Sequence, residues 1–481
     1  MAKLQGEPDL DPTDWDQFRA QAHQALDLMI DNIATVRDRP VWVETPADVK
    51  ASFRTPAPKR GRDMAEVVAD VFEKIVPYSN GNRHPLFMGW VHGAGTPAGM
   101  VAEMLAAGLN SNCGGRNHVV HDIEHQVTRW MAKAFGFPDD ASGLFLTGTS
   151  MANFLAVLVA RTKVLGQDVR TSGLKDHAQL VAYASSEAHG CVKQAFELSG
   201  IGSANLRIIP VDQQGAMVIG ALARQLAADR NAGLLPFMVA GTAGTVNTGA
   251  FDDLTAIADL AAAENLWFHV DGAFGALAAL SPALASRVKG MERADSIAFD
   301  FHKWAHVPYD AGFLLVRDAK VHRETFASPV AYLSRAPRGL ASGEDWPCDY
   351  GPDLSRGFRA LKAWFTFQVH GMSQIGACME HCCAIATYLA NRIEGSARFE
   401  VRAPVALNIV CIGVKGSEDG ALERELVMAL HESGEAVPSL TVLEGRPTLR
   451  CAFVNHRTTF ADVDHFLDQL EQCADRLTAQ P

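Results

Sequence analysis

Two stretches decide the fold: residues 266–275, LWFHVDGAFG, and residues 295–304, DSIAFDFHKW. Each begins with a short apolar run and ends in ionisable side chains, which are Asp271 in the first stretch and His302 and Lys303 in the second. The separation of 32 residues between Asp271 and Lys303 matches the length of one strand–helix–strand unit. Ligands of open α/β sheets bind beyond the carboxyl ends of the strands, so we expect both ends to face one site.

Further apolar runs of strand length lie on both sides of these two stretches, separated by segments of helix length. They are LVAYAS (180–185), LRIIPV (206–211), FMVAGTAG (237–244) and GFLLVRD (312–318). Strands that are buried on both faces are apolar throughout rather than alternating. The pattern therefore predicts βαβ units and an α/β fold with a mostly parallel sheet.

The segments outside this region predict two further parts. An amphipathic helix over residues 14–36 and a second helix near 63–76 indicate an N-terminal helical arm. After residue 371 a long helix is followed by the strand-like runs FEVRAP, ALNIVCIGV and TLRCAFVN and by a closing helix. The predicted domains are an arm (1–85), a large α/β domain (86–370) and a small C-terminal α+β domain (371–481).

The composition is that of an ordinary globular protein. Of the 481 residues, 48% are hydrophobic and 20% are charged, and the formal net charge is −12 without a basic block. We therefore expect neither a nucleic acid nor a membrane as a partner. The start of the chain is not a secretory signal, and the nine cysteines are scattered, which predicts free thiols, no metal site and a cytoplasmic location.

The residues at the strand ends suggest the chemistry. A partly desolvated lysine has a lowered pKa and forms an imine with an aldehyde, although Lys303 could also be a surface lysine. A buried carboxylate must be paired, and a protonated pyridine nitrogen is a suitable partner for Asp271; a helix cap or an arginine pair are the alternatives. Gly272 and Ala273 leave room for a flat ring beside the backbone.

Two more segments complete the set of groups. Leu146–Met151, LTGTSM, precedes a predicted helix, where free N–H groups and the hydroxyls of Thr149 and Ser150 form an anion site or a simple helix cap. His189 ends the run SSEAH after a predicted strand and could stack on a planar cofactor or be structural. An amine, a carboxylate, a phosphate site and a stacking imidazole together are what pyridoxal phosphate requires.

On the motifs HVDGAFG, DFHKW and SSEAH, the sequence resembles the group II pyridoxal-phosphate-dependent amino-acid decarboxylases from about residue 83 to 470. It is most similar to their aromatic-L-amino-acid branch. The resemblance implies PLP fold type I, which is the aspartate aminotransferase-like fold. It also implies a homodimer with shared active sites that converts an L-amino acid to an amine and CO2.

The resemblance also implies a role for individual residues. Lys303 would be the Schiff-base lysine, Asp271 the partner of the ring nitrogen, and His189 and Ala273 the residues on the two faces of the ring. A loop tyrosine, Tyr332, would close over the partner subunit's site and protonate the substrate carbon. The remaining cofactor-binding residues would be Thr149, Ser150, Thr245 and His302.

The sequence indicates the substrate less clearly than the cofactor. The expected pocket residues are Trp90, His92, Asn112 and Ser355. Ser355 aligns with a position that carries Ser in phenolic and Gly in indolic plant relatives, which favours a tyrosine- or dopa-like substrate over tryptophan. The polar segment 110–112, NSN, resembles the glutamate branch, so an acidic or polar substrate of the glutamate or diaminobutyrate type is an alternative. Asp300 stands where relatives often carry Asn near the phosphate.

Other reactions remain open at this point. The same lysine would serve a decarboxylating aldehyde synthase or an aminotransferase. A different class is suggested by residues 121–125, HDIEH, which fit the H-x-x-E-H motif of zinc metallopeptidases. That motif is short enough to occur by chance.

Overall fold

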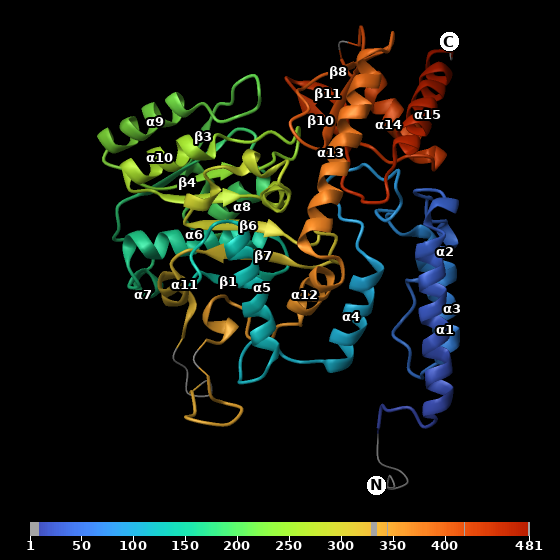
Figure 1. Cartoon of the computed structure of the whole chain (residues 1–481), viewed down its shortest axis with the longest axis horizontal. Helices are drawn as coiled ribbons and strands as arrows, with labels where there is room; N and C mark the ends of the chain where they lie inside the picture. Colours follow the sequence, from blue (N-terminus) through green and yellow to red (C-terminus); the bar gives the residue numbers. More distant parts are fainter. Residues whose placement is uncertain (1–8, 329–333, 344, 418, 480–481) are drawn as a thin grey trace.

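The structure is a computed structural model that describes residues 9–328, 334–343, 345–417 and 419–479. Figure 1 shows a large α/β body, a smaller α+β unit built from the last part of the chain, and an arm of N-terminal helices that lies beside the smaller unit. The α/β class and the mostly parallel sheet predicted from the apolar runs are confirmed.

The large body contains a seven-stranded sheet in the order β1-β7-β6-β5-β4-β2-β3. Only β7, among these strands, runs antiparallel to its neighbours β1 and β6. The strands are β1 (Ser142–Leu146), β2 (Leu180–Ser185), β3 (Leu206–Ile209), β4 (Leu235–Thr242), β5 (Trp267–Asp271), β6 (Ser296–Asp300) and β7 (Gly312–Val316).

Helices cover both faces of this sheet (Figure 1). Successive residues of β6 belong to opposite sides, because Ile297 and Phe299 pack in one core cluster and Ala298 in the other. This is why its sequence is apolar throughout. The helices of the body are α4 (Pro97–Leu109), α5 (Val120–Ala134), α6 (Thr149–Leu165), α7 (Val169–Ser172), α8 (Gly190–Leu198), α9 (Ile219–Asn231), α10 (Leu254–Glu264), α11 (Ala319–Phe326) and α12 (Arg359–His370).

The sheet brings three chain segments to one edge. Asp271 pairs in register with Ala298, two residues before the end of β6, and Asp300 pairs with Gly312. A Cβ at Gly312 would lie 2.3 Å from the Cα of Gly148, so the absence of a side chain lets the turn before α6 approach this edge. The end of β5, the end of β6 and the start of α6 therefore meet.

The smaller unit has a four-stranded antiparallel sheet in the order β10-β11-β9-β8, covered by helices. A long helix, α13 (Met372–Glu394), connects it to the large body. Its other elements are β8 (Phe399–Val401), β9 (Ile409–Val414), α14 (Ala421–Ser433), β10 (Ser439–Leu443), β11 (Arg446–Ala452) and α15 (Phe460–Thr478).

The arm contains α1 (Trp15–Ala34), α2 (Ala47–Ser52) and α3 (Met64–Asp70). The side chain of Asp14 caps α1 by accepting from the backbone N–H groups of Asp16 and Gln17. The only buried residue of α1 is Asn32, so its apolar side chains are at most partly covered by the described part of the chain.

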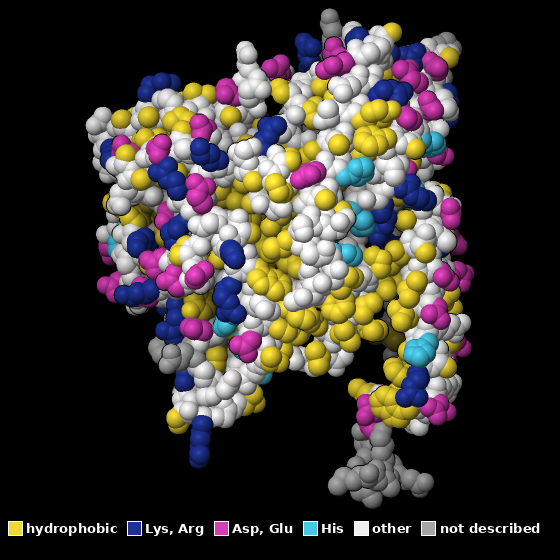
Figure 2. All heavy atoms as spheres, viewed as in Figure 1, with side chains coloured by type: hydrophobic (Ala, Val, Ile, Leu, Met, Phe, Trp, Pro, Cys, Tyr) yellow, Lys and Arg dark blue, Asp and Glu magenta, His cyan; other side chains and the backbone are white. Residues whose placement is uncertain are grey.

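Figure 2 shows hydrophobic side chains gathered across the lower middle of this face, between the arm and the large body. Exposed large hydrophobic residues of α1 and α4 include Trp15, Phe18, Leu28, Ile30, Met104, Leu105 and Leu109. Within the described ranges, no helix is both long and apolar enough to pass through a membrane.

Candidate active site

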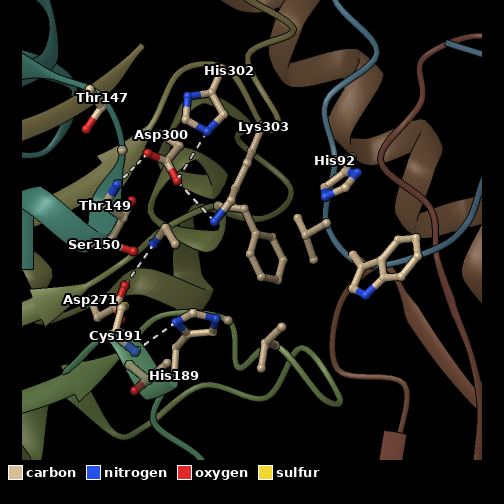
Figure 3. Close-up of a pocket in the computed structure, with 18 of the residues that line it drawn as sticks. His92, Thr147, Thr149, Ser150, His189, Cys191, Asp271, Asp300, His302 and Lys303 are labelled. Atoms are coloured by element: carbon tan, nitrogen blue, oxygen red, sulfur yellow. Dashed lines mark hydrogen bonds and ion pairs between the residues drawn. The ribbon is translucent and has the colours of Figure 1, made fainter. Parts of the chain in front are cut away.

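A cavity of about 410 Å³ opens where the ends of β5 and β6 meet the start of α6. Figure 3 shows ionisable side chains from these segments turned toward one another, with His92 on the opposite side. The structure brings together seven of the predicted cofactor residues here: Thr149, Ser150, His189, Asp271, Ala273, His302 and Lys303. They come from four separate stretches of sequence.

Lys303 is held by a carboxylate rather than left unpaired. Its Nζ lies 3.0 Å from Asp300 Oδ2, and the other oxygen, Oδ1, accepts a hydrogen bond of 2.8 Å from the backbone N–H of Thr149. Burial lowers the pKa of the Lys303 ammonium, but the Asp300 carboxylate, together with the smaller effects of Asp271 and Cys191, raises it, so the pKa lies above its usual value. The lowered pKa that the sequence predicts is wrong for this chain, because the prediction counted burial without Asp300.

Asp271 is a buried carboxylate with neutral partners. It accepts from Asn153 Nδ2 at 3.1 Å and from the backbone N–H of Ala273 at 3.3 Å. Burial raises its pKa, and the nearby positive charge of His189 and Lys303 opposes that rise. It pairs with no arginine, so an ionised Asp271 has room for a cationic partner from the cavity.

The start of α6 fits a phosphate group. The hydroxyl of Thr149 is buried and has no hydrogen-bond partner among the described residues, while Ser150 is exposed to the cavity. The first N–H groups of a helix and its dipole favour an anion at this position. His302 Nδ1 accepts from the backbone N–H of Ala311 at 3.0 Å, so the proton of a neutral His302 ring lies on Nε2, close to the same site.

His189 is fixed by its own helix. It is the N-cap of α8, where its Nδ1 accepts from the backbone N–H of Cys191 at 3.2 Å. Its ring is exposed toward the cavity, as Figure 3 shows, and Ala273 lines the same cavity. The two residues can therefore contact a flat ring that enters between them.

Two predicted substrate residues, Trp90 and His92, also line the cavity. The ring of His92 stacks on Trp90 with centroids 5.5 Å apart and on Phe87 at 5.7 Å. A Cβ at Gly93 would lie 1.9 Å from the carbonyl oxygen of His302, so this segment can press against the end of β6 only with a glycine there.

The other predicted residues are not in the cavity. Thr245, which is predicted to bind the cofactor, does not line the cavity. Its hydroxyl accepts from the backbone N–H of Ala250 inside a turn, and the neighbouring residue Val246 lines the cavity instead. Asn112 and Ser355 are exposed on the surface away from it. Tyr332 lies outside the described residues.

The H-x-x-E-H segment has a structural explanation. Glu124 is buried, and its carboxylate is bound by Arg356 through hydrogen bonds of 2.7 and 3.1 Å. It also accepts from the backbone N–H of Phe145 at 3.1 Å, so it is not free to act as a general base on water. In the described part of the chain no group of three His, Cys, Asp or Glu side chains is placed to hold a metal ion.

Sequence reasoning missed several residues near the site. Tyr309 lines the cavity with its ring 4.3 Å from that of His302. Asn153 and His269 lie behind Asp271. Two spacings could have identified these last two residues: Asn153 is one helical turn after Thr149, and His269 is two residues before Asp271 on the same face of a strand.

Comparisons with known proteins agree with this geometry. Residues 46–415 match the pyridoxal-dependent decarboxylase conserved domain. The chain is 31% identical over 476 residues to an aromatic-L-amino-acid decarboxylase of Bacillus atrophaeus, with 96% of each chain covered. It is 28% identical to tyrosine decarboxylase 2 of Narcissus pseudonarcissus, covering 93% of this chain and 91% of the relative.

The fold agrees as well. The solved structure of Oryza sativa TDC with PLP and tryptamine superposes with a TM-score of 0.89, at 24% identity, over 98% of this chain and 100% of the other. Fold type I is thereby confirmed. The chain belongs to the pyridoxal-dependent decarboxylase family, and it is a carboxy-lyase that uses pyridoxal phosphate to act on an amino acid.

Proposed function

We propose that the protein decarboxylates an aromatic L-amino acid, with tyrosine or dopa as the first candidates and tryptophan as the next. The observation that best supports this is the aromatic wall of the cavity, formed by Trp90 and His92. Lys303 is the only Lys or Arg among the described lining residues, so the side chain of glutamate would meet no second cation there. The names of the Bacillus and Narcissus relatives point to the same substrate class.

The residue roles in this proposal follow the geometry. Lys303 holds the cofactor covalently, Asp271 pairs with its ring nitrogen, and His189 and Ala273 contact its two faces. The phosphate binds at the start of α6, to Thr149, Ser150 and His302. Bound pyridoxal phosphate supplies an electron sink for the electron pair that is released when the Cα–carboxylate bond breaks.

Protons have to be moved at two places. The Lys303 ammonium must lose a proton before the amine can react with an aldehyde, and the Asp300 carboxylate 3.0 Å away opposes this loss because it stabilises the ammonium. After CO2 leaves, Cα needs one proton. By resemblance this donor is Tyr332; His189, whose Nε2 carries the proton of a neutral ring, is the second candidate.

The active unit in this proposal is a homodimer. Several large apolar side chains of α1 and α4 are exposed in the described part of one chain, and a second copy would bury them. Asn112 and Ser355 would then complete the site of the partner subunit. Light scattering on the purified protein tests this, because a monomer that is fully active would contradict it.

A product assay tests the reaction. The purified holoenzyme is incubated with each of the twenty amino acids, dopa and diaminobutyrate, and CO2, amine, aldehyde and keto acid are measured. The proposal predicts CO2 and amine in equal amounts, with tyrosine or dopa turned over fastest. Fastest turnover of glutamate or diaminobutyrate would contradict the aromatic assignment.

The same assay separates the rival reactions. An aminotransferase yields a keto acid and no CO2. An aldehyde synthase consumes O2 and water and releases aldehyde, CO2, ammonia and hydrogen peroxide in equal amounts. By the role assigned to Tyr332, the Tyr332→Phe variant should shift products from amine toward this aldehyde set. A variant that makes only amine would show that another residue donates the proton.

A further inference from the structure

A row of buried polar side chains extends from Asp271 away from the cavity. Asn153 Nδ2 donates to Asp271 Oδ2 at 3.1 Å, and Asn153 Oδ1 lies 2.8 Å from His269 Nε2. His269 Nδ1 lies 2.8 Å from Ser296 Oγ, which accepts from Trp267 Nε1, also at 2.8 Å. None of these five side chains belongs to a residue more than 6% exposed.

The groups at the two ends of this row favour one direction for its hydrogen bonds, because the Trp267 indole can only donate and an ionised Asp271 carboxylate can only accept. An indole N–H can only donate, so Ser296 accepts from Trp267 and has one proton left to give to His269 Nδ1. With the Asn153 NH2 group donating to Asp271, the proton of a neutral His269 ring lies on Nε2, where it is donated to Asn153 Oδ1. The amide oxygen of Asn153 therefore faces the histidine, and its NH2 group faces Asp271.

The opposite direction leaves groups unpaired. With the Asn153 amide reversed, its oxygen would face the Asp271 carboxylate, and the hydroxyl proton of Ser296 would have no acceptor in the row. The observed orientation also gives the second amide hydrogen an acceptor, because Cys191 Sγ lies 3.2 Å from Asn153 Nδ2.

The row keeps this direction across the physiological pH range. Burial lowers the pKa of His269 to about 3, so the ring stays neutral. A protonated ring would carry hydrogens on both nitrogens and could not accept from Ser296. Since the row also lacks a lysine, an arginine or a second carboxylate, Asp271 is its only group that gains or loses charge near neutral pH.

We propose that Asn153 is a positioning residue whose amide, oriented by Trp267, Ser296 and His269, holds Asp271 as an ionised hydrogen-bond acceptor and thereby keeps the ring nitrogen of the bound cofactor protonated. The inference rests on the proposed pairing of Asp271 with that nitrogen. Without the amide donor, burial favours a neutral carboxylic acid at Asp271, and a neutral acid cannot balance a protonated ring nitrogen.

The protonation state of the ring nitrogen can be measured directly. We would reconstitute the wild-type enzyme and the Asn153→Leu and His269→Leu variants with pyridoxal phosphate labelled with ¹⁵N in the ring, and record the ¹⁵N chemical shift. The expected result is a protonated nitrogen in the wild type, a clear shift toward the unprotonated value in Asn153→Leu, and a smaller shift in His269→Leu. Decarboxylation should fall by about 10- to 100-fold in Asn153→Leu, as for other residues that orient a directly acting group.

Two further variants distinguish an error in the role of Asn153 from an error in the role of Asp271. Asn408→Leu removes another buried asparagine, whose Nδ2 donates to the carbonyl of Phe453 at 2.7 Å in the smaller unit, and should leave the ¹⁵N shift unchanged. Asp271→Asn should give the largest shift. If Asp271→Asn moves the signal while both Asn153→Leu and His269→Leu leave it at the wild-type value, the role of Asn153 is wrong. If Asp271→Asn also leaves it unchanged, the proposed role of Asp271 itself is wrong.

Discussion

The charges at the two ends of the cavity, at the ends of β6 and β5, are balanced in different ways. At the end of β6, the Lys303 ammonium meets the Asp300 carboxylate 3.0 Å away, so charge is balanced by charge within the protein. At the end of β5, Asp271 accepts from an amide, a backbone N–H and, at 4.0 Å, the Cys191 thiol, all of them neutral, so its charge has no balancing partner in direct contact. Asp271 and Asp300 are both buried, whereas the Lys303 side chain is 23% exposed.

The difference shows which end prefers an added cation. A buried carboxylate without a cation is unfavourable, and burial accordingly raises the pKa of Asp271. At the β5 end, the protonated ring nitrogen of the bound cofactor would supply the cation that the buried Asp271 carboxylate lacks. At the β6 end the ion pair is already complete, so Lys303 must give up its proton before it can react.

The largest effect is expected at the end that lacks a cation. Asp271→Asn keeps the size of the side chain but removes its negative charge, so decarboxylation should fall by about 10³-fold or more in single-turnover measurements of CO2 release. The matched change at the other end, Asp300→Asn, should leave the rate of CO2 release from fully loaded enzyme much closer to that of the wild type. An equal loss of CO2 release in the two variants would contradict the proposed difference between the two ends of the cavity.

A buried carboxylate outside the cavity should affect stability instead. Glu124 is fully matched by Arg356, so Glu124→Gln leaves a buried guanidinium unpaired and should lower the free energy of unfolding by about 3–5 kcal/mol in urea denaturation. Replacing both residues with leucine should destabilise the protein less than Glu124→Gln does. A single variant as stable as the wild type would show that the ion pair is not what holds α5 to this region.

The unpaired hydroxyl at the start of α6 should affect cofactor binding. Thr149→Val preserves the shape of the side chain and removes the donor, so the Kd of the apoenzyme for pyridoxal phosphate should rise by about tenfold or more. Pyridoxal, which lacks the phosphate, should bind both proteins equally. An equal loss for pyridoxal would mean that the variant has disturbed the fold rather than a phosphate contact.

The smallest effect is on the pH dependence of cofactor attachment. Asp300 raises the pKa of Lys303, so Asp300→Asn lowers that pKa and leaves more neutral amine at any pH below it. A fall of one pKa unit increases the rate of attachment at neutral pH about tenfold. Stopped-flow absorbance of the apoenzyme mixed with pyridoxal phosphate measures the rate against pH. Asp310→Asn, which removes a carboxylate that pairs with Arg359, is the control and should leave the profile unchanged.

Much of the fold could be predicted because the strands of the large body are buried on both faces. The apolar runs at 180–185, 266–271 and 295–300 correspond to β2, β5 and β6 within one residue. Sequence analysis did not identify β10, whose five residues alternate between buried and exposed positions, or α14 before it. Short half-exposed elements give a weaker pattern than buried strands.

The candidate site was predictable where chemistry follows directly from position along the chain. Lys303 and Asp271 stand at strand ends, and the geometry places both on the cavity. The sequence could not show that Asp300 turns toward Lys303, which reverses the expected pKa shift, or that the Thr245 hydroxyl turns into its own loop. Both errors concern side-chain direction, which depends on contacts between distant segments.

Covalent attachment of the cofactor at Lys303 is the central claim, and borohydride reduction tests it most directly. Reduction of the yellow holoenzyme, followed by digestion and peptide mass spectrometry, should place the cofactor adduct on Lys303. The Lys303→Ala variant should carry no adduct at all and release no CO2. An adduct on another lysine, or turnover by Lys303→Ala comparable with that of the wild type, would contradict the account.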